Sequence, residues 1–239
     1  MNGVRTSAAA LLLAAAALGT SASASAQVYE DQYSDRYRQP YEDSENYALE
    51  LRIGAYQPDA NRNFQTVYGD QRGPLVGLEL DFLPLRIPYV GRIGGGLSFE
   101  WAEYRANACQ DLACANRADE RASFRIFPFG FMAVLRADVL ARELGIPIVV
   151  TGKIGLDLIQ ARERVGSIET SSGVAVGLRW AVQVALELDW INPRAGRNLA
   201  QEWGINHSFF FFEAFGSTAE NGIRVGDDIA YVGGLGLSF

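Results

Sequence analysis

The chain has 239 residues, of which 49% are hydrophobic and 21% charged, with a formal net charge of −7. These values allow one folded domain with a sizeable core, and they argue against a disordered chain and against a basic nucleic-acid binder. Lys153 is the only lysine, and the 25 glycines and 11% aromatic residues are typical of close-packed strands.

Residues 1–26 have the pattern of a secretory signal peptide. Arg5 supplies a positive charge near the start, residues 8–18 form an apolar run, and residues 24–26 are a small-residue cleavage site. The apolar run is too short to span a membrane as an anchor helix. We therefore expect an exported protein whose mature chain begins at Gln27.

Residues 27–46 are polar and rich in tyrosine, and they show no apolar period of 2 or 3.6 residues. Such a segment buries too little apolar surface to fold, so we expect a disordered periplasmic N-terminal segment. Residues 47–239 contain no run of 18 apolar positions, so a membrane-embedded form cannot use helices. In this region apolar residues recur at every second position, which is the period of a β-strand.

The clearest alternating segment spans residues 174–190. Its alternation is unbroken and longer than the usual strand of about five or six residues. A tilted strand that crosses an outer membrane needs about 9–11 residues in the hydrocarbon, and the remainder can project beyond it. Two further segments, 123–135 and 206–215, have phenylalanines on both faces, so their facing is ambiguous. The other five alternating segments are 47–55, 76–82, 92–101, 150–158 and 229–239.

The connections indicate an up-and-down topology. Polar connections follow the odd-numbered segments, at 58–73, 105–121, 160–171 and 216–227. Shorter connections that contain proline follow the second and fourth segments, at 84–89 and 138–147. The connection at 191–204 is longer than a simple turn, and Pro193 followed by residues 195–203 predicts a short helix. Because eight strands return both termini to one side, we expect both termini in the periplasm and the polar loops outside.

The two faces of the strands favour a membrane barrel. The apolar face carries valine, leucine and isoleucine, with Tyr47, Trp101, Trp190 and Phe239 at its ends, where interfacial aromatic girdles lie. The other face combines small residues with acids and bases, as the narrow lumen of an eight-stranded barrel requires. The predicted polar network of the lumen comprises Glu50, Arg52, Glu79, Asp81, Arg92, Glu100, Lys153, Asp157, Arg179, Glu187 and Asp189.

These patterns predict an all-β fold over residues 47–239, an eight-stranded antiparallel up-and-down transmembrane β-barrel. Outward aliphatic side chains would face acyl chains, and the charges of the lumen would be paired or hydrated. Alternation also fits a soluble lipocalin-like barrel with its apolar face inward, so this alternative stays open.

The last strand, Tyr231-x-Gly233-x-Leu235-x-Leu237-x-Phe239, resembles the C-terminal signature of bacterial outer-membrane β-barrels. The resemblance implies that the barrel-assembly machinery reads Tyr231, Leu235, Leu237 and Phe239. Two interior stretches, Ile53–Asp59 and Glu202–Ser208 leading into Phe209–Glu213, are similar to a family of small uncharacterised outer-membrane β-barrel proteins of myxobacteria and their relatives. That similarity implies no enzymatic activity and no functional residues to carry over.

Cys109 and Cys114 lie five positions apart in the polar stretch 107–121. In an exported protein such a pair indicates a disulfide that closes a surface loop. Half of a metal site is the alternative, but no histidine or further cysteine lies nearby.

His207 is the only histidine, and with Ser208 and Glu213 it suggests a hydrolase of the His-Ser-Glu type. Adjacent strand residues point to opposite faces, so His207 and Ser208 cannot meet within one strand, and Glu213 lies about 20 Å further along it. Gly94-Gly95-Gly96 lacks the helix and the Lys-Ser/Thr pair of a phosphate-binding loop. The sequence therefore predicts no enzyme, cofactor or metal.

The sequence predicts a protein of the bacterial outer membrane with an anchoring role or a role in interactions through its surface loops. Its expected partners are outer-membrane lipids, lipopolysaccharide and the barrel-assembly machinery, with no nucleic acid and with an extracellular ligand that the sequence does not identify. A narrow porin-like channel with a preference for cations and a soluble periplasmic lipocalin-like binder are the alternative functions.

Overall fold

The computed structural model describes residues 45–59, 62–69, 72–111, 114–221 and 225–239. The predicted signal peptide at 1–26 and nearly all of the predicted disordered segment at 27–46 lie outside these residues.

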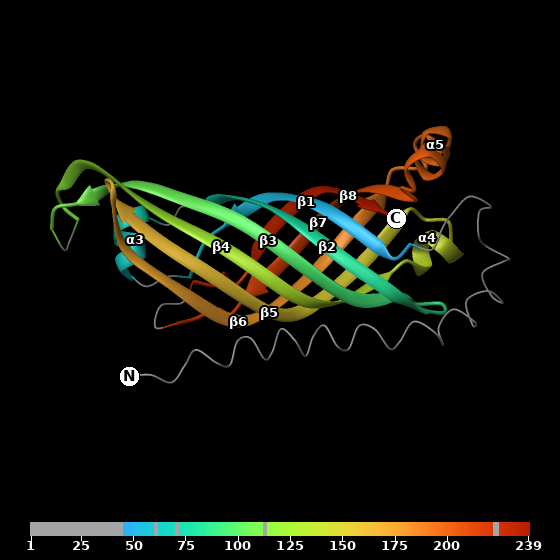
Figure 1. Ribbon diagram of the computed structural model, residues 1–239, viewed down its shortest axis with the longest axis horizontal. Helices are drawn as coiled ribbons and strands as arrows, with labels where there is room; N and C mark the ends of the chain where they lie inside the picture. The colour runs from blue at the N-terminus through green and yellow to red at the C-terminus, as the bar shows by residue number, and fades with distance from the viewer. Residues whose placement is uncertain (1–44, 60–61, 70–71, 112–113, 222–224) are drawn as a thin grey trace. The chain divides into compact units, whose positions relative to one another are not determined.

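Eight antiparallel strands follow one another around a closed barrel, in which β8 pairs with β1 (Figure 1). This confirms the predicted eight-stranded antiparallel barrel. The strands are β1 (Tyr47–Tyr56), β2 (Gly73–Ile87), β3 (Gly91–Cys109), β4 (Arg117–Ala137), β5 (Ile148–Val165), β6 (Ile168–Glu187), β7 (His207–Ser217) and β8 (Ala230–Ser238).

Among the described residues, three short helices lie in the connections: α3 (Arg62–Tyr68), α4 (Val139–Glu143) and α5 (Pro193–Trp203). Helix α5 confirms the helix predicted in the long connection, and it ends before Gly204, whose φ of 66° is a conformation that terminates helices. Figure 1 shows α4, α5 and the C-terminus at one end of the barrel, here called the terminal end, and α3 at the other, here called the loop end.

The seam between the first and last strands closes the sheet. The amide of Tyr47 donates to the carbonyl of Phe239 over 2.8 Å, and the amide of Phe239 donates to the carbonyl of Tyr47 over 2.9 Å. The two rings lie 5.9 Å apart. A closed sheet leaves no strand edge unpaired, which is the condition for a strand protein to sit in hydrocarbon.

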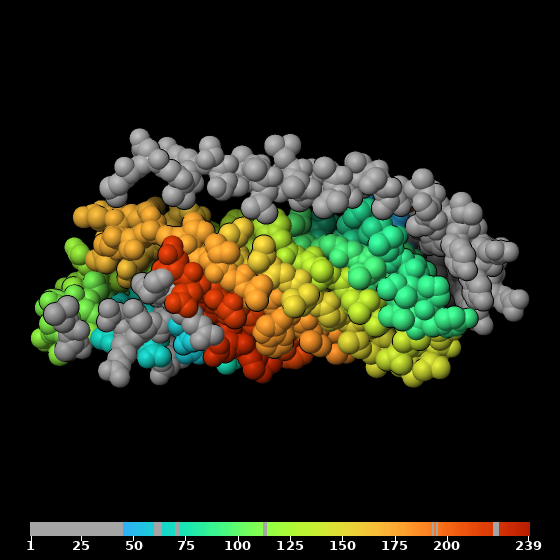
Figure 2. Space-filling view, turned by 90° about the horizontal axis from the view of Figure 1, so that it is seen from below, coloured from blue at the N-terminus to red at the C-terminus, as the bar shows by residue number. Residues whose placement is uncertain are grey.

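Across the middle of the barrel wall, outward side chains are apolar and most inward side chains are polar or charged, whereas inward positions nearer the loop end, such as Leu75 and Ile126, carry buried apolar side chains. Leu78 is 51% exposed on β2, whereas its neighbour Glu79 is 1% exposed. The predicted facing is therefore confirmed, and the lipocalin-like alternative, with an apolar interior and a polar exterior, is wrong. On the face shown in Figure 2, the outward side chains form a continuous surface across neighbouring strands.

The facing of β4 and β7, which the sequence left ambiguous, is now defined. On β4, Phe129 and Phe131 face outward. On β7, the outward phenylalanines are Phe210 and Phe212, and the buried, inward ones are Phe209, Phe211 and Phe215.

The strands at the loop end are longer than predicted. Most of the predicted connection at 105–121 is strand, because β3 continues to Cys109 and β4 begins at Arg117. The predicted connection at 160–171 shrinks to the two residues between Val165 and Ile168. In these extensions the outward positions are polar, and apolar residues such as Ala108 of β3 and Ala161 of β5 lie on the inward side, in or against the buried hydrophobic cluster. The prediction followed the outward apolar residues and therefore ended the strands where those residues stop.

Strand β6 ends earlier than predicted, at Glu187 rather than Trp190. The amide of Ile191 donates to the carbonyl of Leu188 over 2.9 Å, so a turn begins where the apolar alternation still continues. None of the helices in the described residues is long and apolar enough to cross a membrane.

A charge placed on the outward face tests this arrangement. Leu78 lies near the middle of the apolar stripe of β2, between Leu51 of β1 and Phe99 of β3. We expect Leu78→Arg to lower the free energy of unfolding in phospholipid vesicles by about 2–4 kcal/mol, because the guanidinium must be desolvated in hydrocarbon. Urea titration followed by tryptophan fluorescence measures this change.

The control is Ser167→Arg, in the turn between β5 and β6, where Ser167 is exposed. It should change the free energy of unfolding by less than about 0.5 kcal/mol. Equal costs for the two variants would show that the apolar stripe does not face lipid.

Candidate functional site

The centre of the barrel holds a network of buried charges around Arg52 and Lys153. Arg52 donates to Glu213 and forms ion pairs with Glu79 and with Glu100, the latter at 3.2 Å from Nε. These side chains are 0% exposed, so the charges are compensated only by one another. The partners of Arg52 come from three strands (β2, β3 and β7), which the network ties together across the lumen.

Lys153 of β5 is the second cation of this network. Its Nζ lies 3.3 Å from Glu50 and 2.8 Å from Glu213, and it also pairs with Glu79. Glu50 accepts a further hydrogen bond of 2.7 Å from the side-chain amide of Gln183. The single lysine of the chain is thus placed among three carboxylates inside the barrel.

Arg179 of β6 forms the third centre. Its two terminal nitrogens donate to both oxygens of Glu100 over 2.6 and 2.9 Å, and Asp157 lies 3.8 Å away. Its guanidinium carbon also lies 4.3 Å from the ring centroid of Phe215. A planar guanidinium group can donate two parallel hydrogen bonds to a carboxylate while it stacks on an aromatic ring, which an ammonium group cannot do as well.

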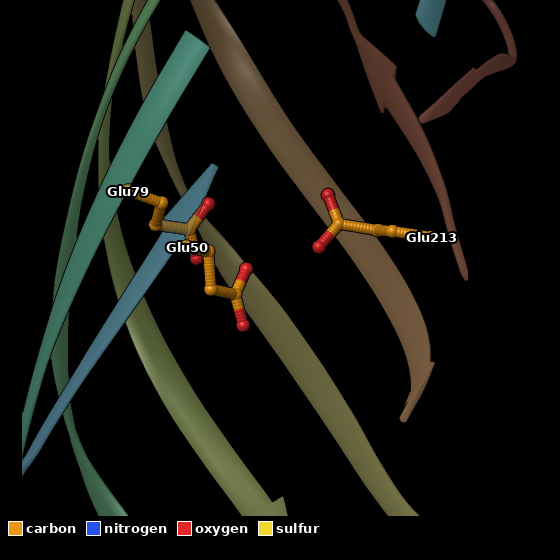
Figure 3. A group of neighbouring side chains, drawn as sticks. All are labelled: Glu50, Glu79 and Glu213. Atoms are coloured by element: carbon orange, nitrogen blue, oxygen red, sulfur yellow. The ribbon is translucent and has the colours of Figure 1, made fainter. Parts of the chain in front are cut away.

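Glu50, Glu79 and Glu213 are a possible metal-binding group, because their ligand oxygens lie within 4.8 Å of one another. Figure 3 shows Glu50 and Glu79 together, with Glu213 pointing towards them from another part of the wall. The ammonium of Lys153 contacts all three carboxylates, and Arg52 contacts two of them. The protein's own cations therefore occupy the position that a metal ion would take, and the cluster does not fit a metal.

A second cluster lies at the terminal end of the barrel, around Glu45. Its carboxylate lies 3.1 Å from Nε2 of His207 and 3.4 Å from Arg142, and it accepts a hydrogen bond of 3.0 Å from Ser238. Arg142 also pairs with Glu187 at 3.1 Å. The cluster joins the start of β1 to the start of β7 and the end of β8, beside the seam.

Burial disfavours the ionised form of Glu45 and by itself raises the pKa of its carboxyl. The nearby cations Arg142, His207, Arg136 and Arg92 outweigh burial and lower the pKa to about 2. The carboxylate is therefore ionised at every physiological pH.

An aromatic cluster closes the loop end of the interior. Phe64 of α3 packs 4.9 Å from Tyr68, 5.4 Å from Tyr104 and 5.2 Å from Phe124. Tyr104 donates to the carbonyl of Tyr56 over 2.5 Å. We call these five side chains the aromatic plug. They set apolar rings above the charge network, on the side where a channel would open.

The plug is anchored by hydrogen bonds to the wall and the loops. The hydroxyl of Tyr56 donates to the carbonyl of Val225 over 2.8 Å, and that of Tyr68 donates to Glu163 over 3.2 Å. Burial, and then the charge and hydrogen bond of Glu163, raise the pKa of Tyr68 well above its usual value, so it remains a donor.

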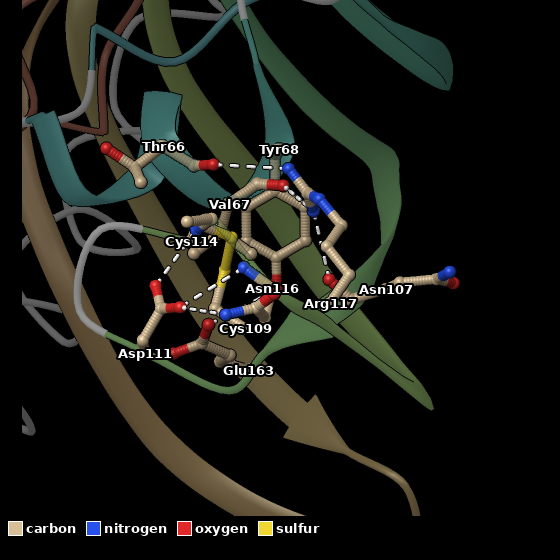
Figure 4. Close-up of a disulfide and its surroundings, with 11 residues drawn as sticks. Thr66, Val67, Tyr68, Asn107, Cys109, Asp111, Cys114, Asn116, Arg117 and Glu163 are labelled. Carbon is tan, nitrogen blue, oxygen red and sulfur yellow. Dashed lines mark hydrogen bonds between the residues drawn. A yellow bond between two sulfur atoms is a disulfide. The ribbon is translucent and has the colours of Figure 1, made fainter.

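The Cys109–Cys114 disulfide closes the hairpin between β3 and β4 (Figure 4). Asp111 accepts hydrogen bonds of 2.9 Å and 3.1 Å from the amides of Ala115 and Asn116. Arg117 donates to the carbonyl of Val67 in α3 over 3.0 Å, so the hairpin is tied to the helix that carries the plug. Hydrogen bonds therefore join the β3–β4 hairpin to α3 at the loop end.

The structure brings most of the predicted lumen residues together, but not all of them. Arg92 lies at the terminal end, 3.9 Å from Glu45, and Glu187 belongs to the same cluster. Asp189 lies beyond the end of β6, is only partly buried, and contacts Nδ1 of His207 at 2.5 Å. The other eight predicted residues are buried at inward positions of the central wall: Glu50, Arg52, Glu79, Asp81, Glu100, Lys153, Asp157 and Arg179.

Sequence reasoning left Glu213 out of the lumen network and considered it only in a triad with His207 and Ser208, which it rejected. The structure does not assemble that triad, because Glu213 contacts Arg52 and Lys153, whereas His207 contacts Glu45 and Asp189. The plug residues Tyr56 and Tyr104 were also missed. Both share the inward parity of Arg52 and Glu100 on their strands, and this parity could have identified them.

No protein-family model matches the chain, and no curated protein matches it. Among solved structures, the outer membrane protein OprG from Pseudomonas aeruginosa is 10% identical, with 83% of this chain and 97% of that chain covered and a TM-score of 0.50. Neisserial surface protein A is 11% identical, with 81% and 97% covered and a TM-score of 0.48. Ail, the attachment invasion locus protein of Yersinia pestis, is 11% identical, with 82% and 99% covered and a TM-score of 0.40. At these sequence identities the similarity shows a shared fold and nothing more.

Removing the central ammonium tests whether the network is coupled. We expect Lys153→Met to lower the free energy of unfolding by about 3–5 kcal/mol, because it leaves buried carboxylates uncompensated. The double variant Lys153→Met/Glu213→Gln should recover more than half of that loss, because one carboxylate is then neutral. Urea titration in vesicles measures both. If the loss of unfolding free energy in the double variant equals the sum of the losses in Lys153→Met and Glu213→Gln alone, Lys153 and Glu213 do not interact.

The terminal cluster predicts a stability change at acidic pH. The pKa of Glu45 is lowered from 4.5 to about 2, so its contribution is present above pH 4.5 and lost as the pH falls towards 2. A shift of this size corresponds to at most about 3 kcal/mol. We expect Glu45→Gln to reduce the acid-dependent loss of unfolding free energy between these pH values.

The matched control is Glu202→Gln, which removes an exposed carboxylate of α5. Its unfolding free energy should follow that of the unmodified chain across the acid range. If Glu45→Gln also follows the unmodified chain, Glu45 does not contribute the acid-sensitive stability.

Proposed function

We propose that the protein is a closed outer-membrane β-barrel that anchors a structured loop surface in the bacterial outer membrane. The observation that carries this proposal is the combination of an exposed apolar outer face with an interior whose centre is filled by paired charges and whose loop end is filled by aromatic rings. Such a surface is stable only against lipid, and such an interior transports nothing without disrupting its ion pairs. The fold shared with OprG supports the membrane setting.

The aromatic plug favours the anchor over a narrow pore. A conducting path along the axis would have to pass Arg52, whose partners lie on three strands, and then the rings of Phe64 and Tyr104. Eight-stranded barrels have room for their own side chains and little else. We therefore place the activity of the protein at its loop end and outer surface.

Export and assembly belong to the same proposal. The signal peptide at 1–26 would direct export, with both termini in the periplasm and the Cys109–Cys114 hairpin outside the cell. Tyr231, Leu235, Leu237 and Phe239 lie on the outward side of the last strand and its end, which supports their role as a signal for the barrel-assembly machinery. We also propose the narrower kinship with small myxobacterial outer-membrane barrels, which rests on the sequence similarity alone.

Membrane fractionation and electrical recording test this proposal. We expect the chain to resist carbonate extraction, to require detergent, and to show a heat-dependent shift on a gel. Folded protein in planar bilayers should give no unitary conductance steps. Regular cation-selective steps would establish the pore instead, and a monomer folded in plain buffer would exclude the membrane setting.

A further inference from the structure

Five arginines gather on the outward face of the loop-end extensions of β3, β4 and β5. We call them the arginine patch. Four of the five side chains are exposed, and that of Arg125 is 40% exposed. Its members are Arg105, Arg121, Arg125, Arg162 and Arg164.

The strand register places the patch around one small residue, Ser123 of β4. Arg105 of β3 and Arg164 of β5 are its direct cross-strand partners. Arg121 and Arg125 are two positions away on the same strand, on the same face. Direct partners lie about 5 Å apart and next-but-one residues about 7 Å apart, so four guanidinium groups can converge above the serine.

The charges of the patch are only partly compensated within the protein. Glu103 accepts hydrogen bonds of 2.8 Å from Arg105 and 2.9 Å from Arg125, and Glu169 lies 3.8 Å from Arg164. Within the part of the chain that the structure describes, the side chains of Arg121 and Arg162 have no ion-pair partner.

Arg125 and Arg162 are also direct cross-strand partners. Like charges in that relation destabilise a sheet unless an anion lies between them. The arrangement therefore favours an external anion with several oxygens.

The position of the patch on the barrel indicates where that anion comes from. On β4, Arg125 lies four residues closer to the loop end than Phe129, which belongs to the apolar outer face. On β5, Arg162 lies four residues closer to the loop end than Leu158, the paired partner of Phe129. Four strand residues correspond to roughly 13 Å. The patch thus lies on the lipid-facing wall, just past the apolar stripe, where headgroups begin.

Guanidinium groups bind phosphate through paired, charge-assisted hydrogen bonds. We infer that the arginine patch binds the phosphate groups of a phosphorylated lipid of the surrounding leaflet, with one phosphate above Ser123. This inference rests on the proposed membrane function, and it assigns to that function a defined lipid contact. Such a contact would fix the orientation of the β3–β4 hairpin relative to the membrane surface.

Native mass spectrometry of the folded full chain tests the site. The protein is reconstituted in phosphatidylcholine nanodiscs with diphosphorylated lipid A or with its dephosphorylated form. We expect the unmodified protein to retain the diphosphorylated lipid at least tenfold more than the dephosphorylated one. The double variant Arg125→Gln/Arg162→Gln should lose that preference.

The control variant is Arg194→Gln/Arg197→Gln, which removes two exposed arginines from α5 at the terminal end. It should bind like the unmodified protein. A second pair of variants keeps every arginine: Ser123→Glu places a carboxylate at the proposed phosphate position and should abolish retention, whereas Ser123→Gln adds similar bulk without charge and should retain more lipid. A heat-shift gel confirms that each variant is folded.

Three outcomes would overturn the inference in a protein that is inserted in the membrane. Equal retention of the two lipids would show that phosphate is not recognised, and equal retention by the Ser123→Glu and Ser123→Gln variants would show that charge at this position is irrelevant. Tighter binding of heparin or of inorganic phosphate than of the lipid would identify a soluble anion as the ligand. Failure of the chain to insert would instead contradict the proposed function.

Discussion

The structure depends on one constraint: every backbone amide and carbonyl of a lipid-exposed strand must find its partner within the sheet. The bonds between Tyr47 and Phe239 meet this constraint at the seam, where the chain's first and last strands close the ring. Closure at eight strands then determines how much room remains inside. Because the outward positions must be apolar, all charges on the strands of the apolar band must share that small interior, and they are stable there only as a connected network.

The chemistry of the interior follows from its size. Lys153, a compact charge on a flexible stem, contacts three carboxylates at once, whereas Arg52 and Arg179 use planar guanidinium groups that reach partners on different strands. The ring of Phe215 beside Arg179 joins this network to the more apolar part of the interior. Charge pairs fill the centre and the aromatic plug fills the loop end, so the barrel is closed by two different kinds of packing. This leaves its outer wall and loops as the surfaces available for interaction.

Sequence periodicity predicted the strands wherever one face meets lipid. The alternation of Leu78 with Glu79 identifies both the strand and its facing. Neighbouring strand residues lie on opposite faces, so one of them is apolar on the exposed outer face and the next is polar in the lumen. The same rule failed beyond the apolar band, where the outward face of β3, β4 and β5 becomes polar and apolar residues such as Tyr104, Ala122 and Ile159 face the interior. It also could not place Phe64, which reaches the plug from a loop helix, or the pairing of Arg52 with Glu213, which are 161 residues apart and meet only through barrel closure. Local pattern thus predicts the wall, whereas the contacts across the interior depend on the global register.

The extended strands explain why the loop end differs chemically from the rest of the wall. Within the apolar band an outward arginine would have to be desolvated, so the outward positions there are aliphatic or aromatic. Once β3, β4 and β5 pass that band, the same outward parity continues but water and headgroups replace acyl chains, and arginine becomes favourable. Regular strand pairing then brings residues as distant in sequence as Arg105 and Arg164 to either side of Ser123. A flexible loop would not hold guanidinium groups at fixed spacing, so continuing the sheet beyond the apolar band is what makes an ordered anion site on this wall physically possible.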